Sequence, residues 1–189
     1  MEALGFTASD FYYILPELLL AGGAMLVLLL AVITPRNDSL LLGVSMVTVG
    51  TTLLAVWSFV GLDVTVSRGL LAIDGFATFF KVVVLLSAAL TLLMSAPYLR
   101  VEGIKAGEYY FLILCATLGM MFMASGVEMI TLFIGLETMA VSFYVLAGFL
   151  KPNPRSNEAA VKYFLLGAFS LGVLLYGMSL LYGATGTTN

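Results

Sequence analysis

The chain has 189 residues, of which 61% are hydrophobic and only 10% are charged, and its mean hydropathy is +1.10. This balance is far from that of a water-soluble domain and indicates an integral membrane protein. The formal net charge of -3 offers no basic surface for binding nucleic acid, so nucleic acid is not an expected partner.

The sequence contains few residues that could hold a metal or a redox cofactor. It has no histidine, its single cysteine is Cys115, and its carboxylates are scattered along the chain. Haem, zinc and iron-sulfur sites are built mainly from histidine and paired cysteines. No P-loop and no glycine-rich dinucleotide motif is present either. We therefore predict no metal and no cofactor in this chain, so any redox group must belong to a partner.

Six windows are apolar and long enough to cross a bilayer core of about 30 Å. This predicts an all-α, polytopic transmembrane helix bundle that forms a single domain over residues 1–189. No basic segment precedes the first window, so we expect it to remain as a helix and not to be a cleaved signal peptide. The spans are predicted near 13–33, 40–60, 76–96, 110–124, 129–150 and 159–182.

Turn-forming residues separate these windows, because proline and glycine stop helices. We expect breaks at Pro35 to Asp38, at Pro97, at Gly103 and Gly107, and at Lys151 to Pro154. Asp74 with Gly75 is typical of a cap that opens the third helix. Glu128 marks the hairpin between the fourth and fifth helices.

The connectors suggest an orientation. With six spans, Arg68 falls on one side of the membrane and most other connector cations fall on the opposite side, which the positive-inside rule makes cytoplasmic. Both termini are then non-cytoplasmic, in the inner (plasma) membrane of a bacterium, with an organellar membrane as the alternative. The cytoplasmic cations are Arg36, Arg100, Lys105, Lys151 and Arg155.

Glu137 is the leading candidate for a functional residue, because it lies in an otherwise apolar span about 12 Å along the helix from Met129. A carboxylate near mid-membrane costs about 2.5–3.5 kcal/mol on insertion scales and usually handles ions or protons. One interpretation is therefore a carboxyl whose proton is loaded and released as a cation moves. The alternative is a protonated carboxyl that hydrogen-bonds a backbone carbonyl and serves only to hold helices together.

The surroundings of Glu137 follow from helical periodicity. It shares a face with Ala140, Tyr144 and Gly148, and a neighbouring polar stripe runs beside that face. Small residues there would admit another helix or water close to the acid. The stripe consists of Thr131, Gly135, Thr138 and Ser142.

Three further charges lie in or near spans. Glu158 and Lys162 stand four residues apart in the favourable order for an ion pair. Lys162 fits either a proton path, with Glu158 as its partner, or simple anchoring at the membrane surface. Lys81 lies some way into the third span, and we expect its side chain to extend toward the outer face. Ala168 and Gly172 have a spacing that lets a neighbouring helix approach closely.

Residues 132–137 (LFIGLE) and 144–149 (YVLAGF), and more closely residues 158–170 (EAAVKYFLLGAFS) and 174–186 (LLYGMSLLYGATG), form two recognisable blocks. They resemble the fifth and sixth helices of subunit N of proton-pumping NADH-quinone oxidoreductase, respiratory complex I. The resemblance is close over the second half of the chain, and it favours subunit N over the related antiporter-like subunits L and M. The first half matches only in the spacing of its spans.

The resemblance implies that Glu137 is a proton-relay glutamate that pairs with a lysine on a seventh helix, and that Lys162 matches a sixth-helix lysine. It also implies that NAD, FMN, iron-sulfur clusters and quinone reside on partner subunits, that the partners are other membrane subunits of complex I and the lipid bilayer, and that protons are the only small-molecule substrate. No seventh helix follows in this sequence. We therefore expect either the N-terminal part of a longer or split subunit, or a scaffold that moves no proton. A module of a related cation/proton antiporter or membrane hydrogenase is a further alternative.

Overall fold

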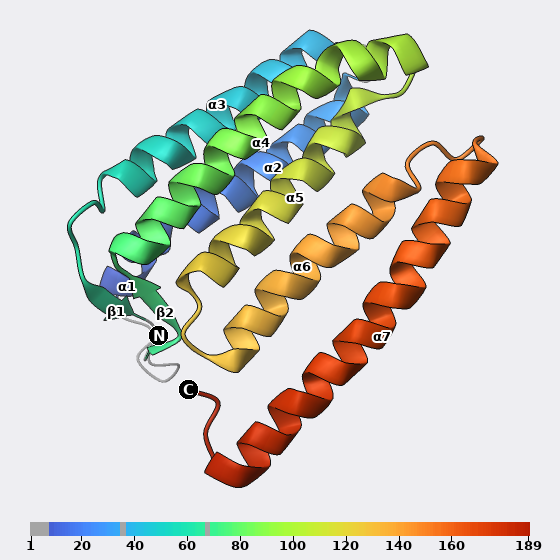
Figure 1. The fold of residues 1–189 in the computed structure, drawn as a ribbon. Helices are drawn as coiled ribbons and strands as arrows, with labels where there is room; N and C mark the ends of the chain where they lie inside the picture. Colours follow the sequence, from blue (N-terminus) through green and yellow to red (C-terminus); the bar gives the residue numbers. More distant parts are fainter. Residues whose placement is uncertain (1–7, 35–36, 67–68) are drawn as a thin grey trace.

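A computed structural model describes residues 8–34, 37–66 and 69–189 of the chain (Figure 1). The described residues form seven helices and one two-stranded antiparallel sheet. The helices are α1 (Ala8–Tyr13), α2 (Leu15–Ile33), α3 (Asp38–Trp57), α4 (Gly75–Glu102), α5 (Ala106–Ser125), α6 (Met129–Ala147) and α7 (Pro154–Thr185), and the strands are β1 (Val64–Val66) and β2 (Leu71–Ile73).

Helices α2 to α7 are each long and apolar enough to cross a membrane, whereas α1 has only six residues. The predicted all-α polytopic bundle with six spans is therefore confirmed. Three residues with a predicted role lie outside the described residues: Pro35 and Arg36 of the first predicted break, and the connector cation Arg68.

Two of the predicted helix breaks are wrong. Pro97 lies inside α4, which continues to Glu102 and ends at Gly103 with a φ of 66°. Gly107 lies in the first turn of α5. Where no water can satisfy free backbone groups, continuing a helix past a proline leaves fewer of them unpaired than ending it there. Gly103 ends the helix because a glycine adopts left-handed backbone angles without steric cost.

The cap predicted at Asp74 is confirmed, and Asn153 forms a second cap that the sequence analysis did not name. The Asp74 carboxylate accepts a hydrogen bond of 2.7 Å from the Ala77 N–H and so caps α4. Asn153 accepts a bond of 3.0 Å from the Arg155 N–H, and Pro154 occupies the first turn of α7. Both arrangements satisfy or remove backbone donors that a helix start leaves unpaired.

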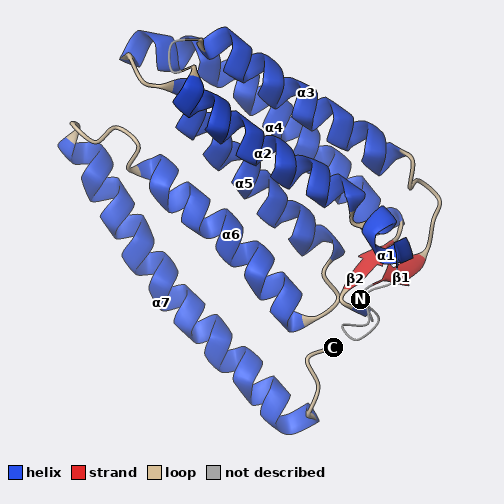
Figure 2. Cartoon of the chain, turned by 180° about the vertical axis from the view of Figure 1, so that it is seen from behind, coloured by secondary structure: helices blue, strands red, loops and turns tan. Residues whose placement is uncertain are grey.

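Helices α2, α3, α4 and α5 form a four-helix bundle in which each helix packs against its two neighbours around the ring (Figure 1). Its core contains fully buried residues from all four helices, among them Leu20, Leu41, Leu85 and Tyr110. Helix α6 lies against the outside of α5, and α7 lies outside α6, as Figure 2 shows from the other side. No residue of α7 is buried.

The contact between α5 and α6 is a close approach of two backbones at Gly119 and Gly135. A Cβ atom on Gly119 would lie 2.5 Å from the Gly135 carbonyl oxygen, and one on Gly135 would lie 2.8 Å from the Gly119 carbonyl oxygen. Glycines at such a crossing let membrane helices approach closely enough for extensive van der Waals contact. This contact fixes α6, and with it Glu137, on α5.

A short β-hairpin closes one end of the bundle. Val64 pairs with Ile73 and Val66 with Leu71, and Leu71 also bridges to Gly126 in the connector between α5 and α6. Three-residue strands are too short to show a pattern, so the sequence did not predict them. Phe59, Val66, Leu71 and Ile73 form a small apolar cluster there, which Tyr13 and Ile14 also join.

We predict that Gly135→Ala destabilises the chain, because its new methyl group would overlap the α5 backbone. Overpacking of this kind costs about 1–3 kcal/mol of unfolding free energy. Gly22→Ala is the matched control, since a Cβ atom at Gly22 meets nothing within 4 Å. Thermal unfolding of the detergent-solubilised protein measures both. Equal midpoints for the two variants would contradict the close contact.

Candidate functional site

Glu137 leaves α6 on the side opposite α5. It follows the α5-facing Gly135 by two residues, which is about 200° around the helix. Tyr144 shares the face of Glu137, and its ring packs edge-on against the rings of Tyr163 and Phe164 of α7, with centroid distances of 4.9 and 5.8 Å. Gly148 also lies against α7, where an added Cβ atom would be 2.8 Å from Ala160 Cβ. The acid therefore faces the seam between α6 and α7.

The carboxylate of Glu137 has an unmet electrostatic requirement. Its Oε2 atom is buried and accepts no hydrogen bond, and no lysine or arginine among the described residues forms an ion pair with it. Buried polar atoms are normally hydrogen-bonded, and an exception requires a reason. A proton on the carboxyl, a water molecule or an approaching cation would each meet the requirement.

The polar stripe beside Glu137 faces α5 and does not supply hydrogen-bond donors to the acid. Thr138 donates its hydroxyl to the Ile134 carbonyl at 2.8 Å, and Ser142 donates to the Thr138 carbonyl at 2.8 Å. Ser142 is buried. Because both hydroxyls donate to backbone carbonyls of their own helix, neither is directed at Glu137. We interpret the stripe as a packing surface.

Glu158 and Lys162 form an ion pair in the first turns of α7. Their side chains are 63% and 70% exposed, so the pair lies on an open surface of the described chain. The structure does not bring the pair together with Glu137. Gly172, expected to admit a neighbouring helix, has nothing within 4 Å of an added Cβ atom, so no described element uses the Ala168 and Gly172 spacing.

Lys81 differs from the sequence prediction. Its side chain is 7% exposed and points into the bundle, where Nζ lies 2.6 Å from Oε1 of Glu17, itself 2% exposed. The prediction that Lys81 extends toward the outer face is wrong, because a buried carboxylate within reach compensates its charge better than a distant membrane surface. Neither oxygen of Glu17 accepts a well-angled hydrogen bond from the described residues, so the compensation is mainly ionic.

Sequence reasoning missed Glu17, although a signal was present. The first and third spans cross the membrane in the same direction, so their starts lie on the same side. Glu17 is about 3 Å into α2 and Lys81 about 9 Å into α4, at a rise of 1.5 Å per residue. Opposite charges at similar depth, entering from one side, are candidates for pairing.

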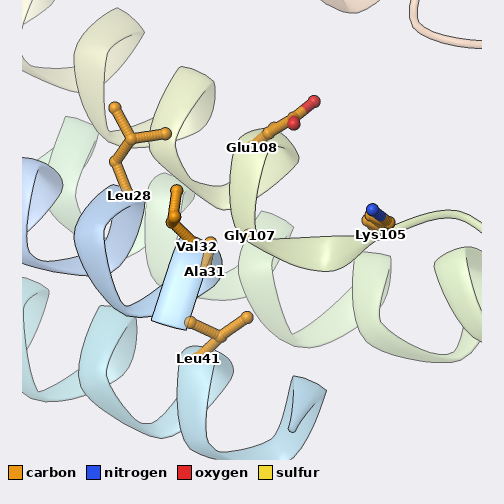
Figure 3. Close-up of a pocket in the computed structure, with 7 residues that line it drawn as sticks. All are labelled: Leu28, Ala31, Val32, Leu41, Lys105, Gly107 and Glu108. Atoms are coloured by element: carbon orange, nitrogen blue, oxygen red, sulfur yellow. The ribbon is translucent and has the colours of Figure 1, made fainter. Parts of the chain in front are cut away.

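A surface pocket lies at the end of the bundle away from the hairpin (Figure 3). Its walls come from the end of α2, from Leu41 of α3 and from the start of α5. Gly107 lets α5 approach α2 there, since an added Cβ atom would lie 2.2 Å from Ala31 Cβ. The charged groups at its rim, Lys105 and Glu108, do not converge on a common point in Figure 3. Within the described part of the chain, no three metal-ligating side chains cluster.

Comparison with known proteins shows which family this chain resembles. A family described as NADH:quinone oxidoreductase/Mrp antiporter, transmembrane, matches residues 124–189. NADH-quinone oxidoreductase subunit N 1 of Koribacter versatilis is 47% identical over 96% of this chain, and subunit N of Parvibaculum lavamentivorans is 40% identical over 99%. Over nearly its whole length, the chain is therefore similar to NADH-quinone oxidoreductase subunit N. It spans 38% and 39% of the length of these two relatives.

Among solved structures, an archaeal membrane-bound sulfane sulfur reductase, a respiratory membrane complex, contains a chain with the same arrangement of helices. The TM-score is 0.80 at 26% identity, covering 95% of this chain and 38% of that one. The family match includes Glu137, Glu158 and Lys162, whereas Glu17 and Lys81 lie outside the matched residues.

We predict that Glu158→Gln and Lys162→Gln each change the unfolding free energy by no more than about 0.5 kcal/mol. An exposed pair four residues apart on a helix contributes little to stability. Thermal unfolding in detergent provides the measurement. A loss several times larger would mean that the pair is held by more than its own helix.

Proposed function

We propose that this chain contributes to proton translocation in the membrane arm of NADH-quinone oxidoreductase, with Glu137 as the group that accepts and releases the proton. The observation that carries the proposal is the buried, unpartnered Oε2 of Glu137 at the α6–α7 seam. The similarity of the chain to subunit N supports it. The chain acts as a single transmembrane domain without a redox site of its own.

The chemistry follows from the cost of charge in a membrane. Desolvation favours the protonated carboxyl, whereas a nearby ammonium favours the carboxylate. A cation that approaches Glu137 therefore releases its proton, and a cation that withdraws lets the carboxyl take up another. Moving one proton against 100 mV requires about 2.3 kcal/mol, which a rearrangement of one ion pair in a low-dielectric site can rival.

The cation comes from outside the described residues. Glu137 faces the side of α6 that only α7 covers, and α7 buries no residue of its own. A further helix that carries a lysine has room to approach this seam. Quinone reduction on partner subunits supplies the energy, and NAD, FMN, iron-sulfur clusters and quinone belong to those partners. Lys162, paired with Glu158 nearer the start of α7, is a candidate for the adjoining proton path.

We predict that Glu137→Gln lowers the number of protons pumped per electron, because glutamine keeps the shape of the side chain but cannot take up and release the proton. Glu137→Ala should lower it as well. The measurement is proton uptake per electron in vesicles that contain the reconstituted complex. Glu128→Gln is the matched control, since it removes the same charge from the connector that precedes α6.

The outcome separates this function from its alternative, a scaffold subunit that moves no proton. The absence of a cation beside Glu137 within the described residues is the observation that favours the scaffold. If both Glu137 variants assemble and pump with wild-type stoichiometry, the relay is rejected. Assembly is followed on native gels, so a variant that fails to assemble is not counted as one that fails to pump.

We also propose that the hairpin end of the bundle faces away from the cytoplasm of a bacterial cell. Asp63, Asp74 and Glu128 lie at connectors on that end, whereas the connectors at the opposite end carry four described cations. An excess of basic residues marks cytoplasmic loops. These cations are Arg100, Lys105, Lys151 and Arg155.

Cysteine labelling tests this orientation. In a Cys115→Ser background, a membrane-impermeant maleimide added outside should label Asp63→Cys and spare Lys151→Cys. Both positions are exposed, so access depends on the side of the membrane. Permeabilised cells, in which both variants should react, provide the control. Labelling of Lys151→Cys in intact cells would reverse the orientation.

A further inference from the structure

The bundle contains a second intramembrane acid, Glu17, whose electrostatic situation is the opposite of that of Glu137. Glu17 is compensated by Lys81 at 2.6 Å, and both side chains are more than nine-tenths buried. Glu137 is not compensated by any described residue. An ionisable side chain in a membrane span requires a functional or structural reason, so the pair needs its own explanation.

The ion pair connects two diagonally opposite helices of the four-helix bundle. Helix α2 packs along α3 and α5, and α4 packs along the same two helices, so α2 and α4 occupy opposite corners. Glu17 and Lys81 reach across this diagonal. The ion pair is therefore a direct bond between two helices that share few backbone contacts, in a fold where lipid supplies no hydrophobic force to hold them together.

The pair also lies beside the closed end of the bundle. Tyr13 and Ile14, one turn before Glu17, join the cluster that the hairpin builds with Phe59, Leu71 and Ile73. Leu71 of this cluster bridges to Gly126, at the end of α5. With side-chain exposures of 2% and 7%, both charges are almost fully buried.

We propose that Glu17 and Lys81 form a charge-matched lock that closes the bundle of α2 to α5 and carries no proton. The lock holds α5, and α5 carries α6 through the contact of Gly119 with Gly135. Its charge match thus prevents an uncompensated charge inside the platform on which the Glu137 helix rests. Removing one partner of a buried ion pair leaves the other charge uncompensated. Replacing both partners by neutral side chains removes the ion pair but leaves no uncompensated charge.

The test is a double-mutant cycle in the assembled complex. The variants are Glu17→Gln, Lys81→Met and the combination of both, with Glu102→Gln, Lys105→Met and their combination as exposed controls near the other end of the bundle. Assembled complex is measured on native gels. Each single variant of the lock should reduce assembly about tenfold or more, since breaking a buried pair is strongly destabilising. The double variant should return to within about twofold of wild type, because no charge is then left unpaired.

Proton uptake per electron is then measured on the double variant. The lock predicts wild-type stoichiometry, in contrast to Glu137→Gln measured beside it. Three results would overturn the proposal: single variants that assemble like wild type, a double variant as impaired as the two singles combined, or a double variant that assembles but pumps fewer protons. The last result would make Glu17 and Lys81 a proton-handling site.

Discussion

Ionised side chains inside a membrane must find their compensation within protein, because hydrocarbon provides neither hydrogen bonds nor counterions. In this chain the Glu17–Lys81 ion pair meets that requirement across the diagonal of the four-helix bundle. The bundle in turn supports α6 through the backbone contact at Gly119 and Gly135. The arrangement of α2, α4, α5 and α6 therefore includes one charge match, between residues far apart in sequence, and one close crossing of consecutive helices.

The two acids illustrate how the same residue type takes different roles through its surroundings. Glu17 has the Lys81 ammonium 2.6 Å from its carboxylate and an apolar cluster beside it, so a described cation compensates it. Glu137 faces the α6–α7 seam with a buried oxygen that no described donor satisfies. An approaching cation finds an uncompensated partner at Glu137, whereas at Glu17 that position is already taken by Lys81. This contrast underlies the proposed division between lock and relay.

The uneven burial of the helices fits a chain that spans less than two fifths of the length of the relatives reported above. Half of the span in α5 is buried, whereas none of the span in α7 is. Helices α2 to α5 complete a core among themselves, and α6 and α7 present the side on which Glu137 lies. Of the six spans, α7 and then α6 have the smallest buried share, so this side of the fold is the one most open to a neighbouring element.

Hydropathy alone determined that the chain crosses a membrane six times, because about 20 apolar residues per span leave few other folds. Local sequence also predicted the cap at Asp74 and the break at Lys151 to Pro154, and it identified Glu137 by its cost in a bilayer. It failed at Pro97, where the surrounding hydrocarbon favours a continuous helix, and at the hairpin, whose strands have three residues each. Only the tertiary structure decided that Lys81 turns inward to Glu17 and that Glu137 faces α7 and not α5. Both facts depend on which helices become neighbours. Glu17 and Lys81 are 64 positions apart, and a pairing over that distance produces no periodic pattern in the sequence.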